Sequence, residues 1–147
     1  MEAHRPDGET DAFQPTSRVI LNIASELMVH SILLYAAFGW LAFSGTMHFI
    51  IDVVSQYLRG RRSPGAEVVL YYGLHSSFAL GQVAFGVLCL WLARRSPALL
   101  ETWPIMTLAL AVGTGWLAIT LTSMEYWEPR FSAVLFSILI VAVILTA

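Results

Sequence analysis

The sequence contains no lysine at all, a single cysteine and few charged residues of either sign. Asp, Glu, Lys and Arg make up 12% of its 147 residues, about half the share found in ordinary soluble proteins. The lack of lysine excludes Schiff-base catalysis through a lysine amine. The single Cys89 excludes an intramolecular disulfide and a cysteine-based zinc site.

Apolar side chains take the place of the missing charge. Hydrophobic residues make up 57% of the chain, and its formal net charge is only −2. Such a chain has too little polar surface to cover a water-soluble globule of this size, and it has no basic excess with which to bind nucleic acid. The composition therefore excludes a soluble enzyme, a disordered protein and a nucleic-acid binder, and it predicts a protein embedded in a lipid bilayer.

Four long apolar stretches follow a polar N-terminal segment. Residues 1–17 are polar and acidic, contain two prolines and lack the basic start of a signal peptide, so we expect a disordered tail. The apolar stretches cover about 27–51, 68–93, 103–123 and 131–147. Crossing the hydrocarbon core takes about 20 residues of helix, and lipid permits only helices or closed barrels. Residues 18–147 are therefore predicted to form an all-α, integral membrane four-helix bundle.

Ionisable and polar side chains gather toward one level of this predicted bundle. In four antiparallel spans, the end of the first, the start of the second and the end of the third lie at the same depth. His48 and Asp52 are four residues apart, so they share a helix face and can pair. Ionisable residues within a span usually face the bundle interior. We therefore predict one polar pocket, with catalytic candidates His75, Asp52 and His48 and ligand-binding candidates Gln82, Glu125, Tyr71 and Tyr72.

Small residues form a second pattern on the second span. Gly73, Ser77 and Gly81 are spaced by four, and small residues at this spacing let another helix approach closely. We therefore expect the second helix to pack through this face and to direct His75 and Gln82 elsewhere.

The predicted pocket leaves more than one class of function open, and whether the chain is an enzyme stays open too. A histidine beside a carboxylate can transfer protons near neutral pH, which favours binding of, or acid–base action on, a small hydrophobic ligand. The alternative is a non-catalytic accessory or assembly subunit of a larger membrane complex. His48, Asp52, His75 and Glu125 offer imidazole and carboxylate ligands to a metal, but His-x3-Asp is a common pattern and we predict no metal site.

One segment resembles a known family. The run His75–Gln82 (HSSFALGQ), early in the second of four spans, is similar to the histidine-led second helix of the styrene oxide isomerase family. Gly115 and Trp116, followed by Pro129, resemble part of that family's third helix. The resemblance implies a trimeric four-helix membrane protein that binds haem between subunits, with His75 as the axial ligand. It also implies that the ferric iron acts as a Lewis acid and opens an epoxide to an aldehyde.

The composition and the four apolar stretches also predict the location and the partners of the protein. We expect a multi-pass protein of a bacterial inner membrane, in contact with lipid and without nucleic acid. A homo-oligomer or a larger membrane complex is compatible with its apolar outer faces.

Overall fold

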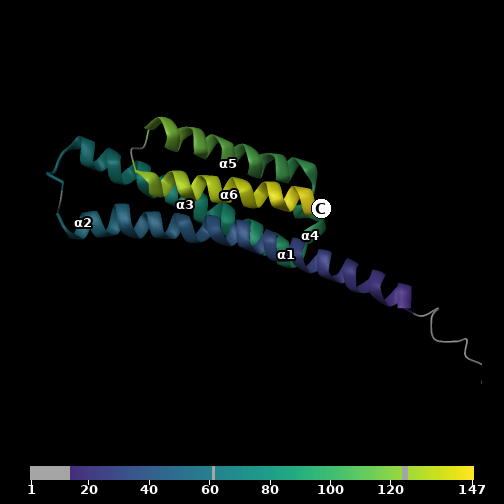
Figure 1. Cartoon of the computed structure of the whole chain (residues 1–147). Helices are drawn as coiled ribbons and strands as arrows, with labels where there is room; N and C mark the ends of the chain where they lie inside the picture. The colour runs from purple at the N-terminus through teal and green to yellow at the C-terminus, as the bar shows by residue number, and fades with distance from the viewer. Residues whose placement is uncertain (1–13, 61, 124–125) are drawn as a thin grey trace, which may run out of the picture.

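The computed structural model describes residues 14–60, 62–123 and 126–147, with side chains from Arg18 onward. Within these residues the chain is helical apart from short turns and contains no strand, which confirms the all-α prediction. The elements are α1 (Gln14–His48), the π-helical segment η1 (Phe49–Ser55), α2 (Gln56–Leu58), α3 (Ala66–Arg95), α4 (Pro97–Leu100), α5 (Trp103–Ser123) and α6 (Trp127–Thr146) (Figure 1).

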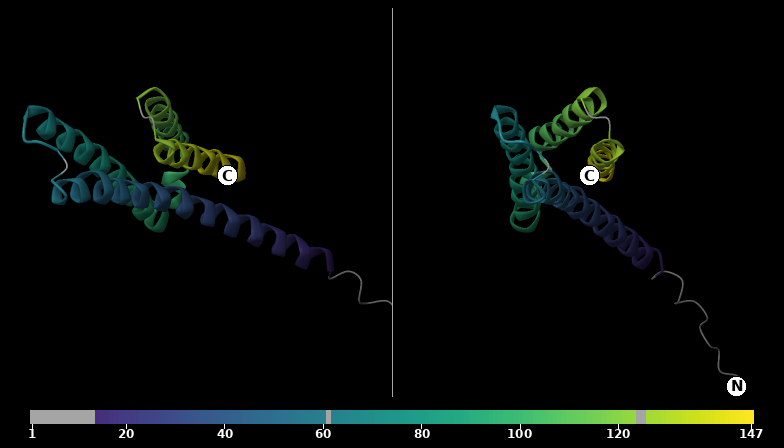
Figure 2. Two further views of the ribbon diagram at one scale, coloured as in Figure 1. Left: turned by 60° about the vertical axis from the view of Figure 1, so that its left-hand side comes forward. Right: turned by 90° about the vertical axis from the view of Figure 1, so that its left-hand side faces the viewer.

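Four of these helical segments are long and apolar enough to cross a membrane, and they contain the four stretches predicted from the sequence. The first begins at Gln14, inside the segment for which a tail is expected, and residues 1–13 lie outside the described part. Pro15 is compatible with this start because the first turn of a helix needs no amide donor. From Arg18 to Leu58 the helix has 41 residues, roughly 60 Å at 1.5 Å per residue. Its N-terminal part therefore projects beyond the bundle (Figures 1 and 2).

The four long helices run antiparallel in sequence order and pack unevenly (Figure 1). α1 packs against both α3 and α6, and α5 packs against α6, whereas α3 and α5 hardly touch. The ring of Phe38 lies at the centre of this arrangement, with its centroid 6.2 Å from that of Phe85 and 6.4 Å from that of Phe136. The core is therefore built around α1, and the weakest side of the bundle lies between α3 and α5.

Glycines allow α1 and α3 to approach very closely. A Cβ atom added at Gly86 would lie 2.8 Å from the backbone nitrogen of Ala42 and 2.9 Å from the carbonyl oxygen of Phe38. One added at Gly45 would lie 2.8 Å from the Cβ of Gln82 and 3.1 Å from the carbonyl oxygen of Ala79. Real Cβ atoms essentially never come within 3.0 Å of such neighbours, so at both positions any larger residue would force the two helices apart.

The face of α3 that packs is therefore not the expected one. Its buried residues recur every three or four positions and are Ala79, Gln82, Gly86, Cys89 and Ala93. At Gly73 and Gly81, an added Cβ would have no atom within 4 Å. The prediction that the Gly73–Ser77–Gly81 face packs closely is wrong, because the glycine contacts at Gly45 and Gly86 hold the opposite side of α3 against α1.

Hydrogen bonds between helices fix the bundle at two levels. The hydroxyls of Ser44 and Ser132 are 2.6 Å apart and join α1 to α6. At the opposite end, the buried His30 ring contacts the Thr146 hydroxyl at 2.9 Å and the Glu101 carboxylate at 3.2 Å. Such polar contacts hold helices together in lipid, where packing has little hydrophobic driving force.

Replacing Gly86 with valine is expected to lower the unfolding free energy by about 1–3 kcal/mol, the usual cost of overpacking a filled contact. The added side chain would meet the backbone of α1, which cannot move without separating the helices. Thermal unfolding of the purified protein in detergent measures the change. Gly73→Val is the matched control, since it adds the same side chain to α3 in open space. Equal effects of the two substitutions would contradict this account of the α1–α3 contact.

Candidate functional site

Two histidines and one aspartate form a continuous chain of side chains between α1 and α3. His48 is the last residue of α1, and its Nδ1 lies 3.0 Å from Oδ2 of Asp52, four residues later in η1. Nε2 of the same ring lies 2.9 Å from Nδ1 of His75 on α3. The predicted pairing of His48 with Asp52 is present, and His75 extends it to the second helix.

The Asp52 carboxylate at one end of this chain of side chains sets the direction of its hydrogen bonds. A carboxylate only accepts, so Nδ1 of His48 donates to Asp52. Nε2 of His48 then carries the lone pair and accepts a hydrogen bond from Nδ1 of His75. In this arrangement the remaining nitrogen of His75, Nε2, is left with its lone pair available to take up a proton or bind a metal.

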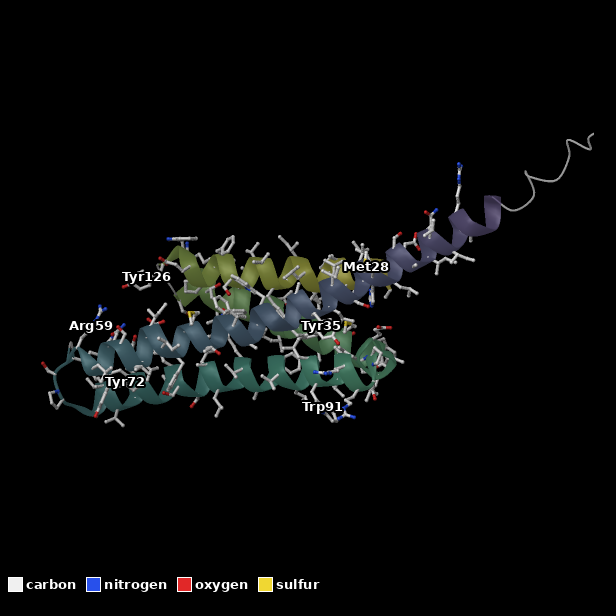
Figure 3. The ribbon with its side chains drawn as sticks, turned by 90° about the horizontal axis from the view of Figure 1, so that it is seen from below. Met28, Tyr35, Arg59, Tyr72, Trp91 and Tyr126 are labelled. Atoms are coloured by element: carbon white, nitrogen blue, oxygen red, sulfur yellow. The ribbon has the colours of Figure 1, made fainter. Side chains whose placement is uncertain are left out.

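Aromatic rings enclose the two imidazoles. The centroids of the Tyr71 and His75 rings lie 4.1 Å apart. The guanidinium of Arg62 lies 3.5 Å from the centre of the Tyr71 ring. On the other side, the edge of Phe78 contacts His48 at 5.2 Å between centroids. Tyr72, which Figure 3 labels near the loop end of the α1–α3 hairpin, packs instead against Tyr57 and Tyr71. Tyr71 is therefore in contact with the histidines, whereas Tyr72 extends the aromatic group toward the loop.

A separate apolar cavity lies where α3 and α5 hardly touch. Its volume is about 320 Å³, at the lower end of the range for ligand sites. The cavity is lined by Leu41 of α1, by Ser77, Phe78, Gly81, Gln82 and Phe85 of α3, and by Val112 and Trp116 of α5. Ser77 and Gly81 are exposed, so the cavity opens at the outer surface of the bundle.

Two residues that line this cavity have buried polar groups with no partner within the described residues. Gln82 is 8% exposed and Trp116 is 6% exposed. Neither the amide oxygen and nitrogen of Gln82 nor the indole nitrogen of Trp116 has a hydrogen-bond partner in the described part of the chain. Buried polar groups are paired in the great majority of cases, so these two are the strongest local sign of a missing ligand or water.

The structure divides the single pocket expected from the sequence. His48, Asp52 and His75 come together, with Tyr71 beside them. Gln82, seven residues beyond His75 and so roughly 10 Å further along α3, lines the cavity on the other side of Phe78. Phe78 contacts both His48 and Trp116, the latter at 5.9 Å between centroids. Glu125, the remaining expected member, lies outside the described residues.

Trp116 was not among the site residues expected from the sequence, although one signal pointed to it. Tryptophan is enriched at the ends of membrane spans, whereas Trp116 lies well inside α5 and is buried. A tryptophan at that depth needs a partner for its N–H group.

The residues around His75 do not form a slot for haem within one chain. Tyr71 and His48 already pack against the His75 ring, and His75 does not line the described cavity between α3 and α5. The haem expectation therefore gains no support from the described residues and stays a prediction.

Comparison of the chain with family models, with curated proteins and with solved structures found no match. Its function is therefore inferred from the geometry of the site alone.

In protein whose cavity holds no bound molecule, replacing Gln82 with leucine is expected to raise the unfolding free energy by about 1 kcal/mol or more. The substitution keeps the approximate volume and removes a buried amide without partners, whose burial costs about 1–3 kcal/mol. Thermal unfolding in detergent measures the shift, and Gln82→Asn, which keeps the amide, serves as the control. A lower melting temperature for Gln82→Leu than for the parent would show that the amide is already satisfied.

Proposed function

We propose that this chain is a multi-pass membrane protein that binds a small, mostly apolar molecule in the cavity between α3 and α5. The observation that carries the proposal is a mostly apolar cavity, two of whose lining residues, Gln82 and Trp116, have buried side-chain polar groups with no partner among the described residues. Ligand sites typically combine an apolar lining with a few polar groups that fix orientation.

The two polar groups favour a neutral ligand that carries oxygen. The indole of Trp116 only donates a hydrogen bond, and the amide of Gln82 both donates and accepts. Once these buried side chains turn toward the cavity, a carbonyl oxygen of the ligand would accept hydrogen bonds from both, and a hydroxyl group would in addition donate to the amide oxygen. With no charged side chain in the lining, an ionised ligand would pay a large desolvation cost without compensation.

Such a ligand would enter from the bilayer. The four long helices have their large apolar side chains mostly on the outside, as expected for contact with lipid. The cavity opens between α3 and α5, so a lipid-soluble molecule would reach it sideways without passing through water.

Two finer expectations are separate from this proposal. Acid–base action by His75 stays a prediction, because Phe78 lies between the histidines and the cavity. Residence in a bacterial inner membrane also stays a prediction, since the structure bears only on the four apolar helices.

Filling the cavity is expected to remove the ligand from the purified protein. Gly81 lines the cavity and has open space around its Cα, so Gly81→Leu would place a side chain inside without disturbing the α1–α3 contact. The measurement is mass spectrometry of an organic extract of the protein purified in mild detergent. We expect a small molecule that accompanies the parent in a fixed ratio and falls at least about tenfold in Gly81→Leu.

Gly73→Leu is the matched control, because it adds the same side chain to the same helix, also in open space but outside the cavity lining. It should retain the molecule at the level of the parent, and Gln82→Leu should reduce it. The proposal would be refuted by an extract in which every small molecule is equally abundant in the parent and in Gly81→Leu.

A further inference from the structure

Contrary to the expectation from the sequence that there is no metal site, we infer that His48, Asp52 and His75 form a binding site for a divalent first-row transition-metal ion of the Zn²⁺ or Fe²⁺ type. One ligand atom from each residue lies within 4.8 Å of the others. Two imidazoles and one carboxylate are ligands that such ions favour, and this set with open positions is a recurrent iron(II) arrangement. The site is independent of the proposed function, because none of these residues lines the cavity between α3 and α5.

The distances place the three side chains close to a coordinating arrangement. Two donors that bind one ion at about 2.1 Å can be at most about 4.2 Å apart. The three ligand atoms, one from each residue, lie within 4.8 Å of one another, so a closure of at most about 0.6 Å brings them within reach of one ion. His48 uses both ring nitrogens in the hydrogen-bonded chain, and one of them must turn toward the ion. A rotation of one side chain achieves this. The hydrogen-bonded chain is then the metal-free arrangement of the same ligands.

The local backbone supplies a second and independent observation. The helix changes from α to π directly after His48, and the π-helical segment contains Asp52. Short π-helical segments within α-helices occur often at functional sites. Here the change in winding occurs between two of the three ligands, where it determines how the carboxylate is presented to the imidazoles.

The surroundings leave the ligands available to an ion. Among the described residues, the only ion pair of Asp52 is the one with His48. The guanidinium of Arg62 is stacked on the Tyr71 ring, 3.5 Å from its centre. The Asp52 side chain is 32% exposed and the His48 side chain 14%, which gives an ion a path from the loop end of the hairpin. Three protein ligands would leave positions for water or a further ligand, as in catalytic rather than structural metal sites.

The test is titration of the untagged full-length protein, purified in detergent and treated with chelator, with Co²⁺ and with Zn²⁺. Calorimetry should give one ion per chain, and the visible bands of bound Co²⁺ should show nitrogen and oxygen ligation. Asp52→Asn, which keeps the size and shape of the side chain, and His75→Ala should each weaken binding at least tenfold, since even indirect partners of a metal contribute 10- to 100-fold.

His30→Gln is the matched control. It removes another imidazole of α1 that also contacts one carboxylate, Glu101, but that has no second histidine beside it among the described residues. Binding in this variant should equal that of the parent. Circular dichroism and gel filtration establish that each variant is folded. If His75→Ala does not fold, Asp52→Asn still tests the site.

Three outcomes would overturn the assignment. Absence of saturable binding in the parent would mean that the three residues form only a hydrogen-bonded chain. Unchanged affinity in folded Asp52→Asn, or an equal loss in His30→Gln, would place the ion elsewhere. A Soret band in the protein as purified, lost in His75→Ala, would assign His75 to haem instead.

Discussion

The close approach of α1 and α3 determines where every polar group of the candidate site lies. The helices are antiparallel, so contact between Gly45 and Ala79 fixes their register. One turn further along α1 is His48, and one turn back along α3 is His75. Their 2.9 Å contact therefore follows from backbone packing at glycine and does not depend on long side chains reaching across a gap. Without that approach the two imidazoles would lie too far apart to form a hydrogen bond.

The type of each element could be predicted from the sequence, but the packing face of α3 could not. Lipid permits helices or closed barrels, and apolar stretches of about 20 residues fit membrane helices rather than the shorter strands of a barrel, so the four helices follow from composition and length. α3, however, carries small residues on two sides, at Gly73 and Gly81 and at Ala79 and Gly86. Which side packs is decided by Gly45 and Ala42 on α1. The packing side of α3 depends on both helices together, so it cannot be predicted from the periodicity of either helix alone.

In the candidate site, too, the features that depend on local helix geometry could be predicted, whereas those that depend on tertiary packing could not. The pairing of His48 with Asp52 follows from helix geometry within one segment, and the depth of His75 follows from antiparallel topology. The separation of Gln82 from the histidines depends on the orientation of Phe78, and the cavity depends on the poor contact between α3 and α5. Neither feature has a periodic signature. Trp116 alone carried a readable signal, because its depth in α5 differs from that of an interfacial tryptophan.

The two groups of polar side chains differ in how the fold compensates their burial. His48, Asp52 and His75 satisfy one another, so their chain costs little when no ion is present. Gln82 and Trp116 have no such compensation within the described residues. Each unpaired group costs about 1–3 kcal/mol, more than the average of about 0.6 kcal/mol that a hydrogen bond between membrane helices contributes. The close contacts at Gly45 and Gly86 already hold α1 against α3, so a hydrogen bond from Gln82 is not needed to join these helices. A ligand oxygen within the cavity would remove this cost, and the free energy of burying the two groups would then become part of the binding energy.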